Sequence, residues 1–199
     1  MTFVRFLWMA IVLQIASLLP ATAEERPLVV YFSWSGNSAQ VARELARITN
    51  GRLVEVQPVV PYPSTYPETL IRVRNERNAL YERGEYPRIR PIDLPSESSS
   101  ILFVCYPLWL GKMAMPMQSF LNKHSAWLKG RVIAAVCATG KSSASKTRAD
   151  LSRLCPESQL VEMLEIKRNE MDSLHLRLRT WVGRVLSTLH STTKSKTVE

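Results

Sequence analysis

The stretch at residues 28–38 reads LVVYFSWSGNS, and it decides the fold of this chain. An apolar run stops in a loop of serine, glycine and asparagine, and an amphipathic stretch, AQVARELARI, follows. This order is typical of a buried parallel strand followed by a helix, whose N-terminal N–H groups and nearby hydroxyls bind a phosphate. The loop has neither a second glycine nor a lysine, so it is neither a dinucleotide fingerprint nor a Walker loop. It predicts a site for a phosphorylated ligand, with a mononucleotide favoured.

The first 23 residues have the pattern of a secretory signal peptide. Arg5 is their only charge, residues 6–19 are apolar except for Gln14 and Ser17, and residues 21–23, ATA, form a small-x-small cleavage site. The apolar core is shorter than the roughly 20 residues that cross a bilayer, so a cleaved signal is favoured over a retained anchor. We therefore expect a periplasmic or secreted protein whose mature chain starts at Glu24.

The chain is basic, with a formal net charge of +9, and loss of the first 23 residues removes only Arg5 and leaves +8. Basic clusters at residues 72–77, 141–148 and 167–184 do not alternate with aromatic residues, and nucleic acid fits poorly with export. The charge instead predicts attraction to anions. The candidates are phosphate, an acidic partner protein and, as a peripheral contact, an anionic membrane surface.

Three cysteines are present, an odd number for an oxidising compartment. Cys105 and Cys137 lie within the apolar runs LFVCY and IAAVCAT and are predicted to be buried thiols. Cys155, beside Pro156, is the candidate for exposure. The chain has no CxxC motif and no Cys/His cluster, so the sequence supports neither a metal site nor a thioredoxin-type centre.

Apolar runs alternate with amphipathic segments along the mature chain. This alternation predicts a doubly wound, five-stranded parallel sheet in a three-layer α/β sandwich over residues 24–190, followed by a disordered tail at 191–199. Residues 58–100 are the exception, a long connection that contains PVVPYPSTYP and a charged helix at 68–83 and that is typical of a functional flap or a partner surface. The predicted strands are residues 28–32, 53–56, 101–106, 132–138 and 160–166, and the other predicted helices are 39–49, 115–123, 145–153 and 172–190.

In such a sheet, ligands bind at the carboxyl ends of the strands, so the segments after the first, third and fourth strands are the candidate site. The first offers hydroxyls and amides, the second an aromatic face beside a glycine, and the third a cationic rim. Together they predict a pocket for a phosphorylated, flat, aromatic ligand. The candidate residues are Ser33, Trp34, Ser35, Gly36, Asn37 and Ser38; Pro107, Leu108, Trp109, Leu110, Gly111 and Lys112; and Thr139 and Gly140.

Four segments, YFSWSGNS, PYPSTYP, YPLWLGKMAMPMQSFL and VCATG, resemble in sequence and in order the flavodoxin-like family. The similar branch has a phosphate loop like FSRTGNT and a second flavin loop like YPIWWG followed by a proline and TFL. The resemblance implies FMN binding and electron transfer. It implies that the amides around Gly36 bind the FMN phosphate and that Trp109 lies on or beside the isoalloxazine ring. Gly111 would lie near the reactive edge of that ring. The resemblance places Thr139 and Gly140 at the far side of the ring, and the phosphate ligands that it implies are Ser33, Ser35, Asn37 and Ser38.

The sequence also departs from this pattern. Trp34 and Ser35 replace the commoner Arg and Thr, Leu110 replaces a second aromatic residue, Lys112 replaces a small polar residue, and KSSASK replaces a glycine-rich third loop. The altered third loop favours an exported binding or interaction protein that has lost flavin function, whereas Trp109 and the hydroxyl-rich first loop favour a flavin site.

Two other enzyme classes, NTPases and serine hydrolases, fit the sequence less well. AVCATGKS only loosely matches a phosphate loop, because alanine replaces its first glycine, and FSWSGNS lacks the first glycine of a nucleophile elbow. No catalytic residue is predicted. The expected function is that of an FMN-binding electron-transfer protein or small flavin-dependent reductase, which exchanges electrons with a redox partner protein or a small-molecule acceptor.

Overall fold

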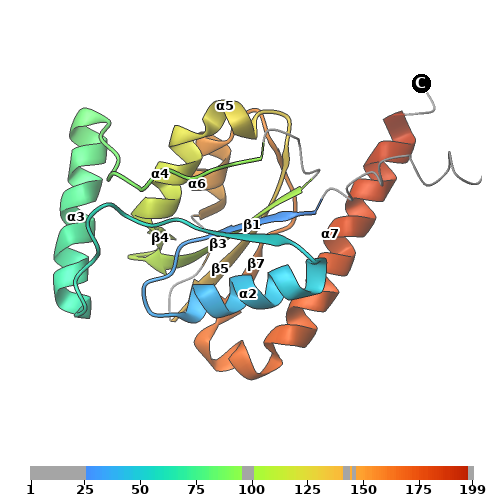
Figure 1. The fold of residues 1–199 in the computed structure, drawn as a ribbon, viewed down its shortest axis with the longest axis horizontal. Helices are drawn as coiled ribbons and strands as arrows, with labels where there is room; N and C mark the ends of the chain where they lie inside the picture. Colours follow the sequence, from blue (N-terminus) through green and yellow to red (C-terminus); the bar gives the residue numbers. More distant parts are fainter. Residues whose placement is uncertain (1–25, 96–100, 141–143, 145–146, 197–199) are drawn as a thin grey trace, which may run out of the picture.

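The computed structural model describes residues 26–95, 101–140, 144 and 147–196; the signal peptide predicted at residues 1–23 lies outside them. The described chain forms a parallel sheet between two layers of helices, which confirms the predicted fold class (Figure 1). The strand order is β2 (Arg52–Glu55), β1 (Leu28–Tyr31), β3 (Ile101–Trp109), β5 (Val132–Thr139), and an edge made of β6 (Gln159–Leu160) and β7 (Leu164–Lys167). The central strands are buried because runs of apolar residues point to both faces.

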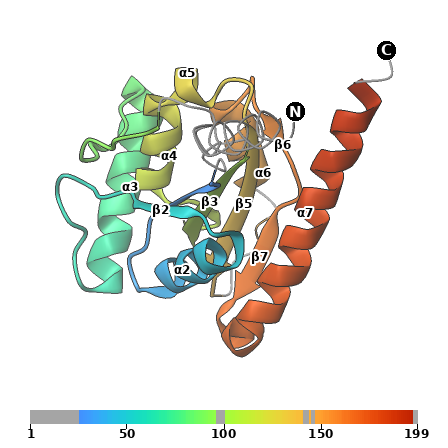
Figure 2. The ribbon, with the colours of Figure 1, turned by 45° about the vertical axis from the view of Figure 1, so that its right-hand side comes forward.

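Each face of the sheet has its own core. On one face, α2 (Asn37–Thr49) and α7 (Leu174–Lys196) contribute Leu45 and Trp181 to a cluster with Phe103 of β3. On the other face, α4 (Met115–Lys123) and α6 (Thr147–Leu154) contribute Phe120 and Leu151. Figures 1 and 2 show α2 and α7 on the side of the sheet opposite to α4 and α6.

The last predicted strand, residues 160–166, is interrupted. Val132 of β5 pairs with Gln159 of β6, an offset of 27 residues, whereas Val136 pairs with Leu164 of β7, an offset of 28. One extra residue has therefore entered the edge strand, as in a β-bulge. Hydrophobicity alone could not show this interruption, because it depends on the register with β5.

β3 also differs from the prediction, which ends the strand at Tyr106. It continues to Trp109, turns through Leu110 and Gly111, and pairs with the short antiparallel strand β4 (Lys112–Met113). Both turn residues have positive φ angles, 50° and 73°, as a tight two-residue hairpin turn requires. Part of the predicted second loop is therefore a hairpin, which fixes its shape more firmly than a loop would.

The long connection after β2 carries α3 (Tyr66–Arg83), two residues longer at its start than the predicted helix. Its two ends are joined, because the Val59 amide donates to Arg88 O at 2.9 Å and the Arg90 amide donates to Gln57 O at 2.8 Å. We call residues 59–88 the excursion. Figures 1 and 2 show its helix alongside α4 at one end of the molecule.

The C-terminal part differs from the predicted helix at 172–190 and tail at 191–199. The short α5 (Ser125–Leu128) and the 3-10 helix η2 (Arg168–Ser173) were not predicted, and α7 continues to Lys196, into the predicted tail. No glycine or proline follows Gly183, so the sequence contains no helix-breaking residue that would end α7 early. Residues 197–199 lie outside the described part.

All three cysteines are buried and unpaired. This confirms the prediction for Cys105 and Cys137 and corrects that for Cys155, which packs with Leu151 and Leu154 of α6 in the core. Cys105 belongs to the core on the α2 side of the sheet and Cys137 to the core on the α4 side, so they cannot form a disulfide. Burial raises the pKa of Cys105, and raises those of Cys137 and Cys155 to about 12.

We therefore expect no thiol of the folded protein to react with a thiol-specific reagent at pH 8, because reaction requires an accessible thiolate. In denaturant, all three cysteines should react. Titration with Ellman's reagent with and without 6 M guanidinium measures both values. A rapidly reacting thiol in the native protein would contradict the burial of these side chains.

Candidate functional site

The first candidate loop leads from β1 into the N-terminus of α2. The Gly36 amide donates to Ser33 Oγ at 3.1 Å, and the first intrahelical bond runs from the Gln40 amide to Gly36 O at 2.9 Å. By helix geometry, the amides of Asn37, Ser38 and Ala39 precede this bond and have no carbonyl of the helix to donate to. Gly36 has a φ of 91°, which a residue with a Cβ rarely adopts. The loop therefore presents the positive end of the helix dipole to a ligand.

Ser38 gives the clearest sign of a ligand. Its side chain is 1% exposed, yet within the described part of the chain its Oγ atom has no hydrogen-bond partner. A buried hydroxyl without a partner is costly, and native structures rarely leave one. A phosphate at the N-terminus of α2 would supply the acceptor, so the residues present fit a phosphorylated ligand.

Trp34 fixes this loop to the excursion. Its Nε1 donates to Pro63 O at 2.8 Å, and Thr69 Oγ1 donates to the same carbonyl at 3.0 Å. The half-buried Trp34 ring lies 6.1 Å from that of Tyr66. In contrast to Trp34, Ser35 is exposed and is free to face a ligand.

Trp109 lies deeper than a free stacking platform would. It is 4% exposed, and its ring lies 5.4 Å from that of Phe32 and 4.8 Å from that of Tyr62. Its carbonyl oxygen accepts a hydrogen bond from Arg77 of α3 at 2.5 Å. Trp109 thus joins the first loop, the second loop and the excursion into one aromatic cluster, and its stacking on a flavin stays a prediction. The other residues of the second loop are Pro107, Leu108, Gly111 and Lys112, which are half-buried, and Leu110, which is exposed.

Tyr62 is held by charges of α3. Its hydroxyl donates to Glu76 Oε2 at 2.5 Å, and the Arg72 guanidinium lies 3.9 Å from its ring centroid while Arg72 Nε donates to Glu76 Oε1 at 2.8 Å. Burial raises the pKa of Tyr62, and the Glu76 carboxylate raises it further, so the phenol stays neutral. The PYPSTYP segment is therefore packed against the aromatic cluster at the candidate site.

The third candidate segment begins at the end of β5. Thr139 is buried and donates through Oγ1 to Glu165 Oε1 at 3.2 Å, while the Ala144 amide donates to Glu165 Oε2 at 3.1 Å. Gly140 is exposed. Lys141 and Ser142, which the sequence associates with this rim, lie outside the described residues.

The sheet brings the three segments to one edge. Tyr31 at the end of β1 pairs with Cys105 of β3, and Cys105 pairs with Val136 of β5. Because these neighbouring strands are parallel, the segments that follow them leave on the same side. The topology therefore gathers the predicted site residues at the carboxyl edge.

A family model described as flavodoxin matches residues 26–185, most of the chain. The chain belongs to the flavodoxin family. A comparison with curated proteins finds no match.

Solved structures of this fold are similar to the chain over most of its length. A candidate flavoprotein from Bacteroides eggerthii has a TM-score of 0.68 at 24% identity, covering 81% of this chain and 98% of the other. A flavoprotein from Lactobacillus acidophilus, solved in complex with FMN, has a TM-score of 0.62 at 15% identity, covering 75% and 97%. A WrbA-like flavodoxin from Agrobacterium tumefaciens has a TM-score of 0.54 at 13% identity, covering 83% and 97%. At these identities the similarity shows the fold.

Two carboxylates at the candidate site were not predicted from the sequence. Glu165 of β7 holds both ends of the described part of the third segment, and Asp150 of α6 contacts the hairpin of the second loop. Neither forms a local motif with the residues that it contacts, which are separated from it by 21 to 38 positions in the sequence. Within its own strand or helix, each of these two residues looks like an ordinary polar residue, so the sequence pattern does not indicate a role in the site.

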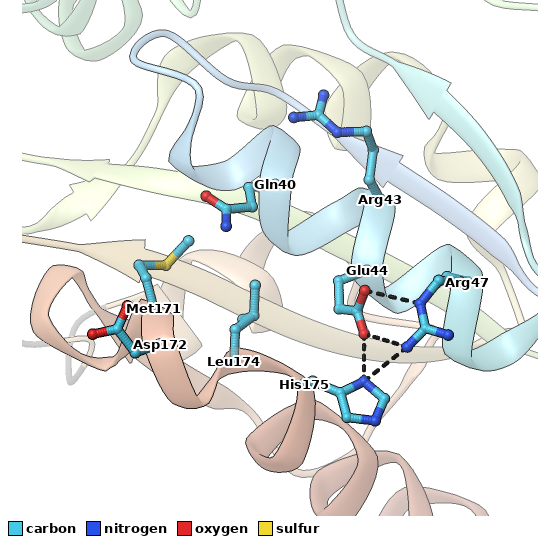
Figure 3. Close-up of a pocket in the computed structure, with 8 residues that line it drawn as sticks. All are labelled: Gln40, Arg43, Glu44, Arg47, Met171, Asp172, Leu174 and His175. Atoms are coloured by element: carbon cyan, nitrogen blue, oxygen red, sulfur yellow. Dashed lines mark hydrogen bonds and ion pairs between the residues drawn. The ribbon is translucent and has the colours of Figure 1, made fainter.

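A separate groove of about 550 Å³ lies between α2 and the η2–α7 junction. Gln40, Met171 and Leu174 are among the residues that line it (Figure 3). Glu44 accepts two hydrogen bonds from Arg47, at 3.0 and 2.8 Å, and its Oε1 lies 2.5 Å from His175 Nδ1 of α7. The hydrogen bonds from Arg47, followed by that from His175, lower the pKa of Glu44 from 4.5 to about 2. This cluster connects α2 to α7 across the groove.

A pH dependence of stability follows from the Glu44 cluster. Because the pKa of Glu44 is lower in the folded than in the unfolded chain, its contribution is complete above pH 4.5 and is lost as the pH falls towards 2. We expect Glu44→Gln to lose less stability than the wild type between pH 5 and pH 3. Urea unfolding at both pH values measures this difference, with Glu157→Gln, in an exposed ion pair, as the matched control. Parallel losses in the wild type and Glu44→Gln would contradict it.

Within the described residues, no helix has both the length and the apolarity needed to span a bilayer, and no group of three or more Cys, His, Asp or Glu side chains is arranged to bind a metal ion.

Proposed function

We propose that this chain binds FMN noncovalently at the carboxyl edge of its sheet and works as an electron carrier or a small flavin-dependent reductase. The observation that carries the proposal is Ser38, whose buried hydroxyl lacks a partner at the N-terminus of α2. The family membership and the order of the three segments along the edge support it. The likeness to a flavoprotein solved with FMN agrees with this choice of flavin.

The chain's own residues would bind and orient the cofactor, and the flavin would supply the electron-transfer chemistry. Ser33, Ser35, Asn37 and Ser38, with the amides after Gly36, would hold the phosphate. The Leu110–Gly111 turn would approach the ring from one side, and Thr139 and Gly140 would border it on the other. The aromatic cluster around Trp109 would keep water from the inner end of the site.

We also propose that the protein works outside the cytoplasm, where a redox partner protein or a small-molecule acceptor exchanges electrons with it. The signal-peptide pattern of residues 1–23 supports this location. An N-terminal sequence beginning at Glu24 in the periplasmic or secreted fraction would agree with export, whereas a chain that keeps residues 1–23 in the cytoplasmic fraction would contradict it.

The experiment for the proposed function is a titration of the apo-protein with FMN, riboflavin and FAD, in which quenching of flavin fluorescence reports binding. We expect FMN to bind and riboflavin to bind much more weakly, because riboflavin has no phosphate for the first loop. If all three flavins fail equally to bind, the flavin function is wrong. The alternative, a binding or interaction protein with a flavodoxin fold, would then be favoured.

A further inference from the structure

Asp150 places a buried carboxylate against the second loop. The residue lies on α6 and is 6% exposed. Its Oδ1 atom lies 3.5 Å from Lys112 Nζ, and its Oδ2 atom accepts from the Met113 amide at 3.5 Å, the long end of the hydrogen-bond range. Both residues of β4, the strand that follows the Leu110–Gly111 turn, therefore contact one carboxylate.

The same hairpin is held from α4. Gln118 donates through Nε2 to Met113 O at 2.8 Å, and its Oε1 accepts from Arg153 Nη2 at 3.1 Å. Arg153 lies 4.0 Å from Asp150 Oδ1 and donates through Nη1 to the Tyr86 hydroxyl at 3.0 Å. The network thus joins α4, α6 and the excursion at the base of the second loop.

The charged side chains of this network differ in how far they are exposed to solvent. Asp150 is almost fully buried, whereas Lys112 is 30% and Arg153 is 51% exposed. Arg77 of α3 also interacts with Asp150 at longer range. A buried carboxylate is costly to desolvate, and a well-packed apolar residue often stabilises a fold as much or more. Asp150 also lies in the first turn of α6, where a carboxylate interacts favourably with the helix dipole, but this local role does not require its contacts with both residues of β4.

We propose that Asp150 is a positioning residue of the flavin site, which fixes the Leu110–Gly111 turn and neutralises Lys112 beside the flavin. The proposal rests on the proposed function. On this account, Asp150 offsets the charge of Lys112, so that this pair by itself adds a net charge close to zero to the field at the flavin. The charge of each residue then cancels much of the electrostatic effect of the other on the reduced flavin.

Removal of the Asp150 charge and removal of the Lys112 charge should change the ratio of reduced to oxidised flavin affinity in opposite directions. Asp150→Asn keeps a side-chain oxygen for the Met113 amide but leaves Lys112 unbalanced, which favours the reduced flavin. Lys112→Met leaves Asp150 unbalanced, which disfavours it. For a charge roughly 10 Å from the ring at an effective dielectric constant near 20, the ratio of reduced to oxidised affinity should shift by about tenfold in each direction. The double variant should return close to the wild-type ratio.

The test measures the dissociation constant of oxidised FMN by fluorescence quenching and the midpoint potential of the bound flavin. The difference between this potential and that of free FMN gives the ratio of reduced to oxidised affinity. The four proteins are the wild type, Asp150→Asn, Lys112→Met and the double variant, with circular dichroism as the check of folding. Glu157→Gln and Lys129→Met form the matched control pair. Lys129 precedes β5 and Glu157 precedes β6, so this exposed ion pair lies at the amino ends of the strands, at the opposite edge of the sheet. Neither control should shift the ratio.

Opposite shifts that cancel in the double variant would support the proposal. A double variant whose ratio stays at that of Lys112→Met alone, or no shift in either single variant, would overturn it. If Asp150→Asn does not fold, Lys112→Met decides alone, and an unchanged ratio overturns the proposal. Absence of flavin binding by the wild type would instead contradict the proposed function.

Discussion

Replacement of both Ser35 and Ser38 by alanine is expected to lower the affinity for FMN by at least about a hundredfold. Each lost hydrogen bond to a charged phosphate costs roughly 1.5 to 3 kcal/mol, and two such losses amount to two or more powers of ten. Riboflavin affinity should stay nearly unchanged, because it has no phosphate to lose. Fluorescence titration of both flavins against the wild type and the variant measures the two ratios.

Ser38 adds a stability control to this prediction. Its hydroxyl is buried and has no partner in the described part of the chain, so Ser38→Ala should leave the apo-protein as stable as the wild type or slightly more stable. Urea unfolding without flavin measures this. Equal losses of riboflavin and FMN affinity in the Ser35/Ser38 variant would show that the phosphate assignment is wrong, and a clear destabilisation by Ser38→Ala would show that the hydroxyl has a structural role.

Trp109→Ala is expected to destabilise the protein by about 3 to 5 kcal/mol, the usual cost of truncating a buried tryptophan. The ring is 4% exposed and packs against Phe32 and Tyr62, so its loss opens a cavity where the first loop, the second loop and the excursion meet. Equilibrium unfolding in urea, followed by far-ultraviolet circular dichroism, measures the change.

Trp109→Phe is the matched control, because it keeps an aromatic ring in the cluster and should cost much less. A different result would also be informative. If Trp109→Ala changes stability by less than about 1 kcal/mol but abolishes binding of both FMN and riboflavin, the ring acts as the stacking platform that the family resemblance implies, and its assignment to the core is wrong.

The elements at the centre of the fold could be predicted because their signal is local. β1, β3 and β5 are uninterrupted apolar runs, and α2 and α4 have the helical period, so pattern alone places them within a few residues. The edge strand could not be predicted as two pieces, because its interruption depends on pairing with β5. The same holds for β4, whose two residues form a strand only because the Leu110–Gly111 turn folds them back on β3.

The candidate site was predictable in outline for a topological reason. Parallel neighbouring strands deliver the segments after Phe32, Tyr106 and Thr139 to one edge, whatever the details of packing. What the sequence could not show is which side chains become buried there. Trp109 is covered because Tyr62 of the excursion packs on it, and Asp150 reaches the second loop from a helix that starts 34 residues after β4 ends. Such contacts depend on the assembled fold.

The central claim is that FMN binds at the carboxyl edge, with its phosphate at the N-terminus of α2. The most direct measurement is a titration of the ¹⁵N-labelled apo-protein with FMN, followed through the backbone amide signals. The account predicts the largest changes at Gly36, Asn37, Ser38 and Ala39 together with Gly111, and with riboflavin a loss of the changes at the first four only. Changes confined to the groove between α2 and α7, or no changes at saturating FMN, would contradict it.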